Sequence, residues 1–181
     1  MKTVLTVAGS DPSGGAGIQA DIKTITAHGL YATSAITALT VQNTLGVSRV
    51  EPVPVDLVVQ QIDCVVGDIR PDAVKIGMLC NAEIVQAVAQ ALAHGQAECI
   101  VIDPVMISTS GHRLLDQEAV QWMKRKLFPM AQLITPNLPE AEALCGMRVR
   151  DEAEMERAAR LLSDQTGAAV LLKGGHLAKT A

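Results

Sequence analysis

Short apolar runs alternate along the chain with segments in which hydrophobic residues recur every three or four positions. The apolar runs, rich in aliphatic and β-branched residues, predict strands, and the helical spacing predicts helices. The expected strands are Thr3–Ala8, Tyr31–Leu39, Asp72–Met78, Glu98–Asp103, Gln132–Asn137 and Ala168–Gly175. The expected helices are Ile18–His28, Leu57–Asp68, Glu83–Ala93, Gln117–Leu127, Glu140–Leu144 and Glu152–Asp164.

This alternation predicts the α/β class, with a mostly parallel sheet and helices on both faces. The length of 181 residues predicts one domain over residues 1–181. Ligands of such sheets bind beyond the carboxyl ends of the strands. The segments to examine therefore follow the strands: Gly9–Gly17, Thr40–Thr44, Met78, Asp103–Ser110, Asn137–Glu140 and Lys173–His176.

Composition narrows the classes of partner. The chain has one Tyr, one Trp and one Phe, too few rings for the stacking platforms that bind single-stranded nucleic acid. A formal net charge of −4 opposes binding to a phosphate backbone. No apolar run reaches the ~18 residues of a membrane helix. The four cysteines form no Cys-x-x-Cys pair, which predicts reduced, buried thiols and a cytoplasmic protein.

The first strand is followed by the glycine-rich stretch "AGSDPSGGAG". Gly9 and Gly14 have the spacing of a P-loop, but Gly15 and Ala16 stand where its lysine and hydroxyl residue belong, so we reject that interpretation. Residues 15–20 match the dinucleotide pattern Gly-x-Gly-x-x-Ala, yet no acidic residue follows the second strand. A turn that only lets a helix start is the third possibility.

Polar or adaptable residues follow the first three strands, and each has a structural alternative. The Gln42 amide can pair with an aminopyrimidine edge or be an ordinary loop residue. The flexible thioether of Met78 can lie on a flat ring or fill the core. Asp21 can accept a hydrogen bond from a substrate hydroxyl or complement the helix dipole from the first turn.

The later strand ends carry charged residues. Asp103 can help to hold Mg²⁺, or can simply begin the Asp-Pro turn. Asn137 and Glu140 have capping-box spacing, and Glu140 can alternatively order water bound to magnesium. Lys173 precedes two glycines, a pattern that can form an anion-binding nest or a plain turn.

Taken together, six segments occur in order: "AGSDPSGGAGIQADIKT", "ITALTVQNT", "KIGML", "DPVM…SGHRLL", "LITPNLPEAEAL" and "LLKGGH". From Thr3 to His176, the chain resembles the hydroxymethylpyrimidine/phosphomethylpyrimidine kinases of thiamine biosynthesis, which have a ribokinase-like three-layer fold. The resemblance implies two phosphoryl transfers from ATP with Mg²⁺, to the pyrimidine alcohol and then to its monophosphate. It also suggests a homodimer.

The resemblance assigns roles to residues of this chain. It implies a pyrimidine site of Gly9, Asp21, Gln42, Met78 and Val105. Asn137 and Lys173 would bind ATP, and Asp103 and Glu140 would hold the metal.

The family also has a later glycine-rich segment containing Thr-Gly-Cys, which supplies an anion hole and the proposed catalytic base. We expect that segment after Ala181, so no catalytic residue is assigned within the chain, and the C-terminal part of the family fold is expected to be missing from it. Three alternatives stay open: a pyridoxal kinase-like vitamin kinase, a truncated non-catalytic pyrimidine-binding fragment and a nucleotide-dependent dehydrogenase.

Overall fold

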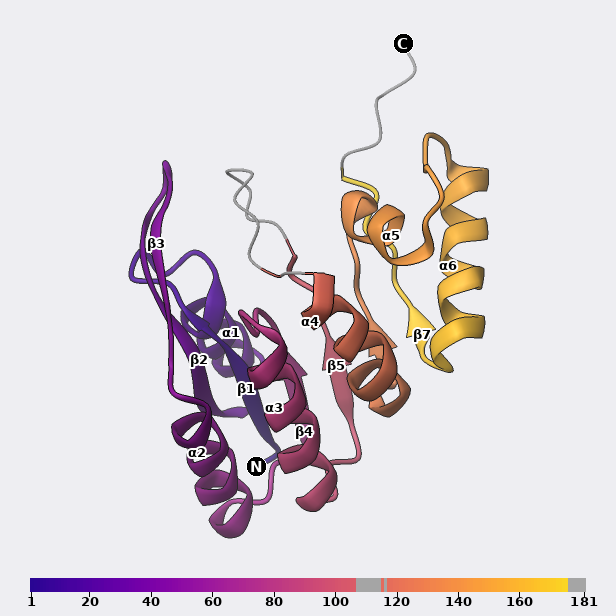
Figure 1. Cartoon of the computed structure of the whole chain (residues 1–181). Coiled ribbons are helices and arrows are strands. Elements are labelled where there is room, and N and C mark those ends of the chain that lie inside the picture. Colours follow the sequence, from indigo (N-terminus) through magenta and orange to yellow (C-terminus); the bar gives the residue numbers. More distant parts are fainter. Residues whose placement is uncertain (107–114, 116, 176–181) are drawn as a thin grey trace.

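The computed structural model describes residues 1–106, 115 and 117–175, and its centre is a seven-stranded sheet (Figure 1). The strands lie in the order β3-β2-β1-β4-β5-β6-β7. Their bounds are β1 Thr3–Ser10, β2 Tyr31–Asn43, β3 Gly46–Pro52, β4 Ala73–Ile76, β5 Ile100–Ile102, β6 Leu133–Ile134 and β7 Ala169–Val170. Every neighbouring pair is parallel except β2 and β3, which confirms a mostly parallel sheet.

Helices cover both faces of the sheet. Their bounds are α1 Gly17–Ala27, α2 Val55–Asp68, α3 Ala82–His94, α4 Gln117–Trp122, α5 Leu138–Cys145 and α6 Glu152–Thr166. In Figure 1, α1 lies behind the strands, whereas α2, α3 and α4 lie in front of them. The α/β class with helices on both faces is therefore confirmed.

The core forms between the central strands and the helices in front of them. Its fully buried members include Leu5, Val7, Ile76, Ile84, Val88, Leu92, Ile100, Ile102 and Ile134. Burying an aliphatic side chain of this size contributes roughly 1.5–3 kcal/mol. Because these side chains fix the middle of each central strand, the carboxyl edge of the sheet is a rigid platform for side chains that follow the strands.

Helix ends follow signals that the sequence carries. The Asn81 side chain accepts a hydrogen bond from the Ile84 N–H at the start of α3, and Asp151 caps α6 in the same way. Gly146 and Gly167 end α5 and α6 in the left-handed conformation, which glycine adopts at little cost.

The cysteines and the hydrophobicity of the helices test two expectations drawn from composition. The four cysteines are free, as expected for reduced thiols. The expectation that they are buried is wrong: Cys80 and Cys145 are only half-buried, and Cys64 and Cys99 are exposed. Cys64 lies on the outer side of α2, and Cys99 lies in the loop before β5. Within the described residues, no helix combines the length and hydrophobicity needed to cross a bilayer.

The segment Thr40–Thr44, expected as a loop, instead continues β2 to Asn43 and turns back as β3. Val41 lies opposite Arg49 in this antiparallel pair. The turn is closed by the Asn43 side chain, whose Oδ1 accepts hydrogen bonds from the N–H groups of Leu45 (2.9 Å) and Gly46 (3.2 Å). The hairpin was missed because its strand β3 carries few apolar residues.

The segment Gln117–Leu127, expected as one helix, has more than one geometry. The α-helical part ends at Trp122, and a π-helix over Met123–Leu127 and a 3₁₀ turn over Phe128–Met130 follow. Pro129 has no N–H to donate, which a residue in the first turn of a helix does not need, and it lies in the short 3₁₀ turn that closes the segment. The wider turn lets Met123, Leu127 and Phe128 all be buried.

Candidate functional site

A cavity of about 610 Å³ opens at the carboxyl edge of the sheet. Its walls come from the ends of β1, β4 and β5, from the β2–β3 hairpin and from the starts of α1 and α5. The residues singled out from the sequence all line it: Gly9, Asp21, Gln42, Met78, Asp103, Val105, Asn137, Glu140 and Lys173. Residues 107–110 and His176, which the strand-end rule also selects, lie outside the described residues.

The glycine-rich loop between β1 and α1 folds around the carboxylate of Asp11, which is 2% exposed. Oδ2 accepts hydrogen bonds from the backbone N–H groups of Gly15 (3.0 Å) and Ala16 (2.8 Å). Oδ1 accepts from the N–H (2.8 Å) and the hydroxyl (2.7 Å) of Ser13. The loop amides directly before α1 therefore already have an anionic partner within the chain.

This arrangement explains the glycines. In a phosphate-binding loop the backbone N–H groups of the glycine-rich segment point to the ligand, whereas here Asp11 accepts hydrogen bonds from the N–H groups of Gly15 and Ala16, directly before α1. Burial would raise the pKa of Asp11, but the hydrogen bonds from Ser13, Ala16 and Gly15 together outweigh burial and hold that pKa below its ordinary value. The loop is thus a self-contained turn that starts α1 and shapes one wall of the cavity.

We expect Asp11→Asn to lower the free energy of unfolding at pH 7 by about 1.5–3 kcal/mol, the range for hydrogen bonds to a charged group. A carboxylate with a lowered folded pKa stabilises the protein above its unfolded pKa of about 3.9, and this stabilisation is lost as the pH falls through the folded value. The difference between wild type and variant should therefore shrink below about pH 4. Urea unfolding at several pH values measures it, and a difference independent of pH contradicts the account.

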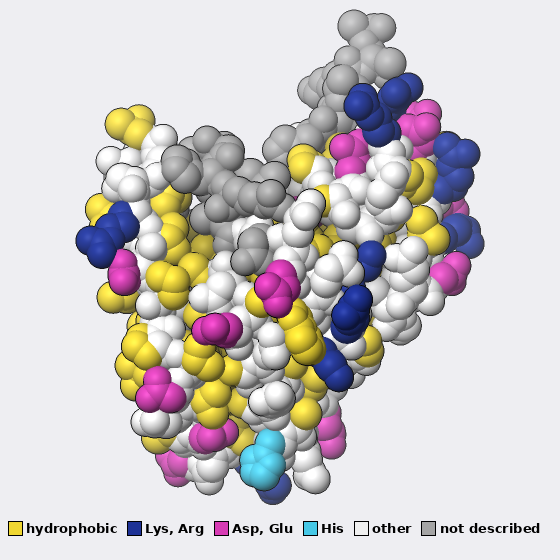
Figure 2. Space-filling model, viewed as in Figure 1, with side chains coloured by type: hydrophobic (Ala, Val, Ile, Leu, Met, Phe, Trp, Pro, Cys, Tyr) yellow, Lys and Arg dark blue, Asp and Glu magenta, His cyan; other side chains and the backbone are white. Residues whose placement is uncertain are grey.

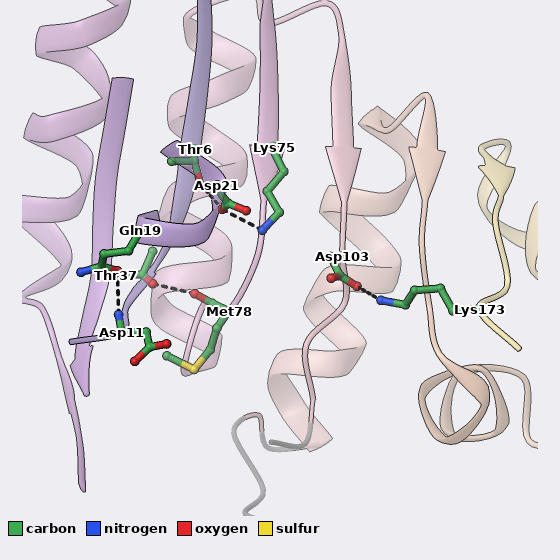
Figure 3. Close-up of polar contacts among 9 residues, drawn as sticks. All are labelled: Thr6, Asp11, Gln19, Asp21, Thr37, Lys75, Met78, Asp103 and Lys173. Atoms are coloured by element: carbon green, nitrogen blue, oxygen red, sulfur yellow. Dashed lines mark hydrogen bonds and ion pairs between the residues drawn. The ribbon is translucent and has the colours of Figure 1, made fainter. Parts of the chain in front are cut away.

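Gly9 and Met78 meet at the floor of the cavity. A Cβ at Gly9 would overlap the terminal methyl of Met78, so the glycine makes room for the thioether. The buried Thr37 hydroxyl donates to the Met78 carbonyl oxygen at 2.6 Å, which fixes the backbone there (Figure 3). The Met78 side chain is placed to form an apolar wall.

Gln42 and Val105 border the same cavity from opposite sides. Gln42 lies on the extended part of β2 and not in a loop, and its Oε1 accepts a hydrogen bond from the Thr40 hydroxyl at 3.3 Å. Val105 follows β5 in a tight turn, where its N–H donates to the Asp103 carbonyl oxygen at 2.8 Å.

Asp21 lies beyond the first turn of α1, because that helix starts at Gly17. The interpretation of Asp21 as a first-turn partner of the helix dipole is therefore wrong. Its Oδ2 accepts hydrogen bonds from the Thr6 hydroxyl (2.6 Å) and from Lys75 Nζ (2.8 Å). Both partners are drawn in Figure 3, and they orient the carboxylate at the edge of the cavity.

The other end of the cavity carries a second ion pair. Lys173 Nζ lies 2.7 Å from Asp103 Oδ1. The Lys173 backbone forms a bridge with Asn137, and its N–H donates to the Pro136 carbonyl oxygen at 2.9 Å. Because the backbone of Lys173 is held in this way, its side chain is the part that is able to exchange partners.

Glu140 is 3% exposed beside this ion pair. Asn137 and Glu140 form the expected capping box at the start of α5, with the Asn137 N–H donating to Glu140 Oε2 at 2.8 Å. Burial raises the pKa of Glu140 and the Asp103 charge raises it further, while the Asn137 hydrogen bond and the Lys173 charge act in the opposite direction. The charges of the Asp103 and Glu140 carboxylates therefore repel one another, and the Lys173 cation offsets part of this repulsion.

These residues fit a magnesium ion bound together with phosphates. The described residues contain no group of three or more His, Cys, Asp and Glu side chains arranged to hold a metal. Mg²⁺ usually keeps several waters and is held by one or two carboxylates together with substrate phosphates. Asp103 and Glu140 supply that number of carboxylates at one end of the cavity.

The family profile described as phosphomethylpyrimidine kinase matches residues 11–181. The chain belongs to the phosphomethylpyrimidine kinase family. It is 49% identical over 176 residues to the hydroxymethylpyrimidine/phosphomethylpyrimidine kinase of Haemophilus influenzae, covering 97% of this chain and 65% of that protein. It is 52% identical over 175 residues to the thiamine biosynthesis bifunctional protein ThiED of Geobacter sulfurreducens, covering 97% of this chain and 36% of that protein.

A solved member of the phosphomethylpyrimidine kinase family has the same fold. The crystal structure of the enzyme from Clostridium difficile 630 superposes with a TM-score of 0.91 and 45% identity, covering 100% of this chain and 78% of that one. The expectation of a ribokinase-like fold is thereby confirmed. The chain spans about two thirds or less of the length of the two curated relatives.

Sequence reasoning missed two polar residues of this kinase-family site. The turn interpretation of the glycine-rich stretch gives Asp11 no role of its own, although an aspartate that precedes several small residues commonly accepts hydrogen bonds from their N–H groups. The strand pattern "AVKIG" predicts no role in the site for Lys75. A lysine between apolar residues of a central strand is itself a signal, because a charge there needs a partner.

Proposed function

We propose that the protein transfers phosphoryl groups from ATP to 4-amino-5-hydroxymethyl-2-methylpyrimidine and then to its monophosphate, giving the pyrophosphate used for thiamine synthesis. One observation carries the proposal: a single cavity has an amide, a thioether and a carboxylate at one end and an acidic pair with a lysine at the other. Family membership is consistent with it.

At the first end, Gly9, Gln42, Met78 and Val105 would enclose the pyrimidine. The Gln42 amide has both donors and an acceptor and can pair with the aminopyrimidine edge. Met78 would lie against the flat ring. Asp21 would accept a hydrogen bond from the hydroxymethyl group, which orients the oxygen that becomes phosphorylated.

At the second end, Asn137 and Lys173 would bind ATP, and Asp103 and Glu140 would hold Mg²⁺. The described lining residues include the acids Asp11, Asp21, Asp103 and Glu140 and the bases Lys75 and Lys173. This excess of carboxylates repels a triphosphate unless a divalent cation accompanies it. The bound ion would neutralise charge on the transferring phosphoryl group, and positioning supplies most of the remaining catalysis.

We assign the general base to none of the described residues. Asp21 is held by Thr6 and Lys75, and Glu140 accepts the hydrogen bond from Asn137 in the capping box. Residues 1–181 are proposed as one ribokinase-like domain.

The decisive experiment incubates the protein with ATP, Mg²⁺ and the pyrimidine alcohol and measures phosphorylated products by mass spectrometry. The expected result is the monophosphate followed by the pyrophosphate. Calorimetry that detects the pyrimidine without turnover favours the non-catalytic binding alternative. Preferential turnover of pyridoxal, supplied in parallel, favours the vitamin kinase alternative and counts against the proposal.

We expect Gln42→Ala to weaken pyrimidine binding by about 1–3 kcal/mol, because the buried polar edge of the ring loses its partner. Affinity for Mg²⁺–ATP should stay nearly unchanged, since Gln42 lies on the hairpin side of the cavity. Calorimetry with each ligand measures both affinities. Equal losses for the two ligands contradict the assignment of Gln42 to the pyrimidine end.

We also propose a cytoplasmic homodimer. The β2–β3 hairpin exposes Leu39, Val41 and Leu45, which are 54%, 57% and 90% exposed. Figure 2 displays hydrophobic side chains along this side of the molecule, whereas Lys and Arg gather on the side of α6. An apolar projecting hairpin supports association with a second copy.

A further inference from the structure

Lys75 is a charged residue inside a strand whose neighbours are buried. Val74 and Ile76 are 3% and 0% exposed. Successive strand residues face opposite sides of the sheet, so the Lys75 side chain lies on the face that carries α1, where its Nζ pairs with Asp21 at 2.8 Å. Its side chain is only 28% exposed. Desolvating an ammonium group is costly, which calls for a reason beyond packing.

The ammonium group lies at the wall of the cavity, beside Gly77. An ideal Cβ on Gly77 would lie 3.0 Å from Lys75 Nζ, so the ammonium lies directly over Gly77. The parallel register pairs Ile76 with Ile102, which places Gly77 beside Asp103. Lys75 Nζ therefore lies between Asp21 at the pyrimidine end and Asp103 at the nucleotide end, as Figure 3 also shows.

The positive charge of Lys75 matters for the binding of one of the two proposed acceptors, the negatively charged one. In the proposed function, on which this inference rests, the first acceptor is a neutral alcohol and the second is a monophosphate with a charge of about −1.5 to −2. The second acceptor must approach Asp21, Asp103 and the nucleotide phosphates. Among the described residues that line the cavity, the bases are Lys75 and Lys173, and Lys173 lies on the far side of Asp103 (Figure 3).

We propose that Lys75 is the specificity residue that admits the phosphorylated acceptor, by transferring its ammonium group from Asp21 to the acceptor phosphate. A lysine ammonium has three donors on a flexible stem, which suits it to this exchange of partners. With the neutral alcohol, the Lys75–Asp21 pair stays intact and Asp21 orients the hydroxyl. With the monophosphate, the ammonium offsets the added negative charge at the junction of the two ends.

The test measures the affinity of the protein for the pyrimidine alcohol and for its monophosphate by calorimetry, without nucleotide. Lys75→Gln should weaken monophosphate binding about tenfold or more, the size of a lost charged hydrogen bond, and change alcohol binding much less. Lys75→Arg should retain the preference because the charge remains. Asp21→Asn should bind the monophosphate at least as tightly as wild type, because Lys75 is then released from its partner.

The double variant Asp21→Asn with Lys75→Gln separates loss of the lysine from repulsion by an unpaired Asp21. The proposal expects weak monophosphate binding in this variant as well, and recovery to the wild-type affinity overturns it. Equal losses for both acceptors in Lys75→Gln also overturn it, since Lys75 would then only position Asp21. A wild-type protein that binds neither compound overturns the proposed function along with this inference.

Discussion

Gly17→Ala is expected to lower the free energy of unfolding by about 2–5 kcal/mol, which combines a left-handed backbone cost with overpacking. Gly17 has φ +56°, and a Cβ there would overlap the Gly9 carbonyl oxygen. Its Cβ would also lie 3.3 Å from the Asp11 N–H nitrogen. The substitution therefore forces apart the end of β1 and the start of α1, and both line the cavity.

Gly29→Ala is the matched control. Gly29 also has a positive φ, +72°, but no atom lies within 4 Å of its ideal Cβ, so only the backbone cost of roughly 1–2 kcal/mol is expected. Urea unfolding of the two variants measures the difference. Gly17→Ala should also weaken pyrimidine binding, whereas Gly29→Ala should not. Equal destabilisation by the two substitutions would mean that contact between Gly17 and Gly9 carries no energetic cost.

The sheet could be predicted because two separate signals in the sequence mark each central strand. The apolar run marks the strand, and a polar or glycine residue directly after it marks the carboxyl end, as in Ile100–Asp103. The hairpin could not be predicted in this way. Its second strand, Gly46–Pro52, is stabilised by pairing with β2 and by the Asn43 turn more than by burial, and the apolar pattern carries no trace of such pairing.

The site could be predicted as a set of strand ends, but its internal partners could not. Parallel topology sends Gly9, Met78 and Asp103 to one edge whatever their side chains do. Asp11 accepts the hydrogen bonds of the loop amides, and Lys75 pairs with Asp21. Both contacts depend on φ/ψ values and side-chain directions. These become fixed only when α1 packs on β1 and β2.

The two ion pairs of the cavity lie where a charged ligand can reach them. Lys75–Asp21 joins β4 to α1, and Lys173–Asp103 joins the segments that follow β7 and β5, all at one cavity. Partly exposed pairs of this kind contribute little to stability, roughly 0–1 kcal/mol. Their chemical value lies in holding charges that a ligand of opposite sign can take over, which is why substitutions there should change binding far more than folding.

Asp103→Asn is accordingly expected to weaken Mg²⁺–ATP binding about 100-fold. This is the upper end of the range for substitution of outer-shell partners of a metal. We choose the upper end because the described site offers only two carboxylates. The asparagine keeps the shape of the side chain but removes the charge that faces Lys173 and the cation. The free energy of unfolding should change by less than about 1 kcal/mol, since the Lys173 and Asp103 side chains are 42% and 29% exposed.

Asp72→Asn provides the matched control. It removes a similar lysine–aspartate pair, formed with Lys2 at 2.5 Å. Asp72 directly precedes β4 and Lys2 directly precedes β1, so this pair lies at the amino edge of the sheet, opposite the cavity. Its Mg²⁺–ATP affinity should match that of wild type. If calorimetry gives Asp103→Asn and Asp72→Asn the same affinity, Asp103 holds no cation for the nucleotide, and the acidic end of the cavity must serve only to anchor Lys173.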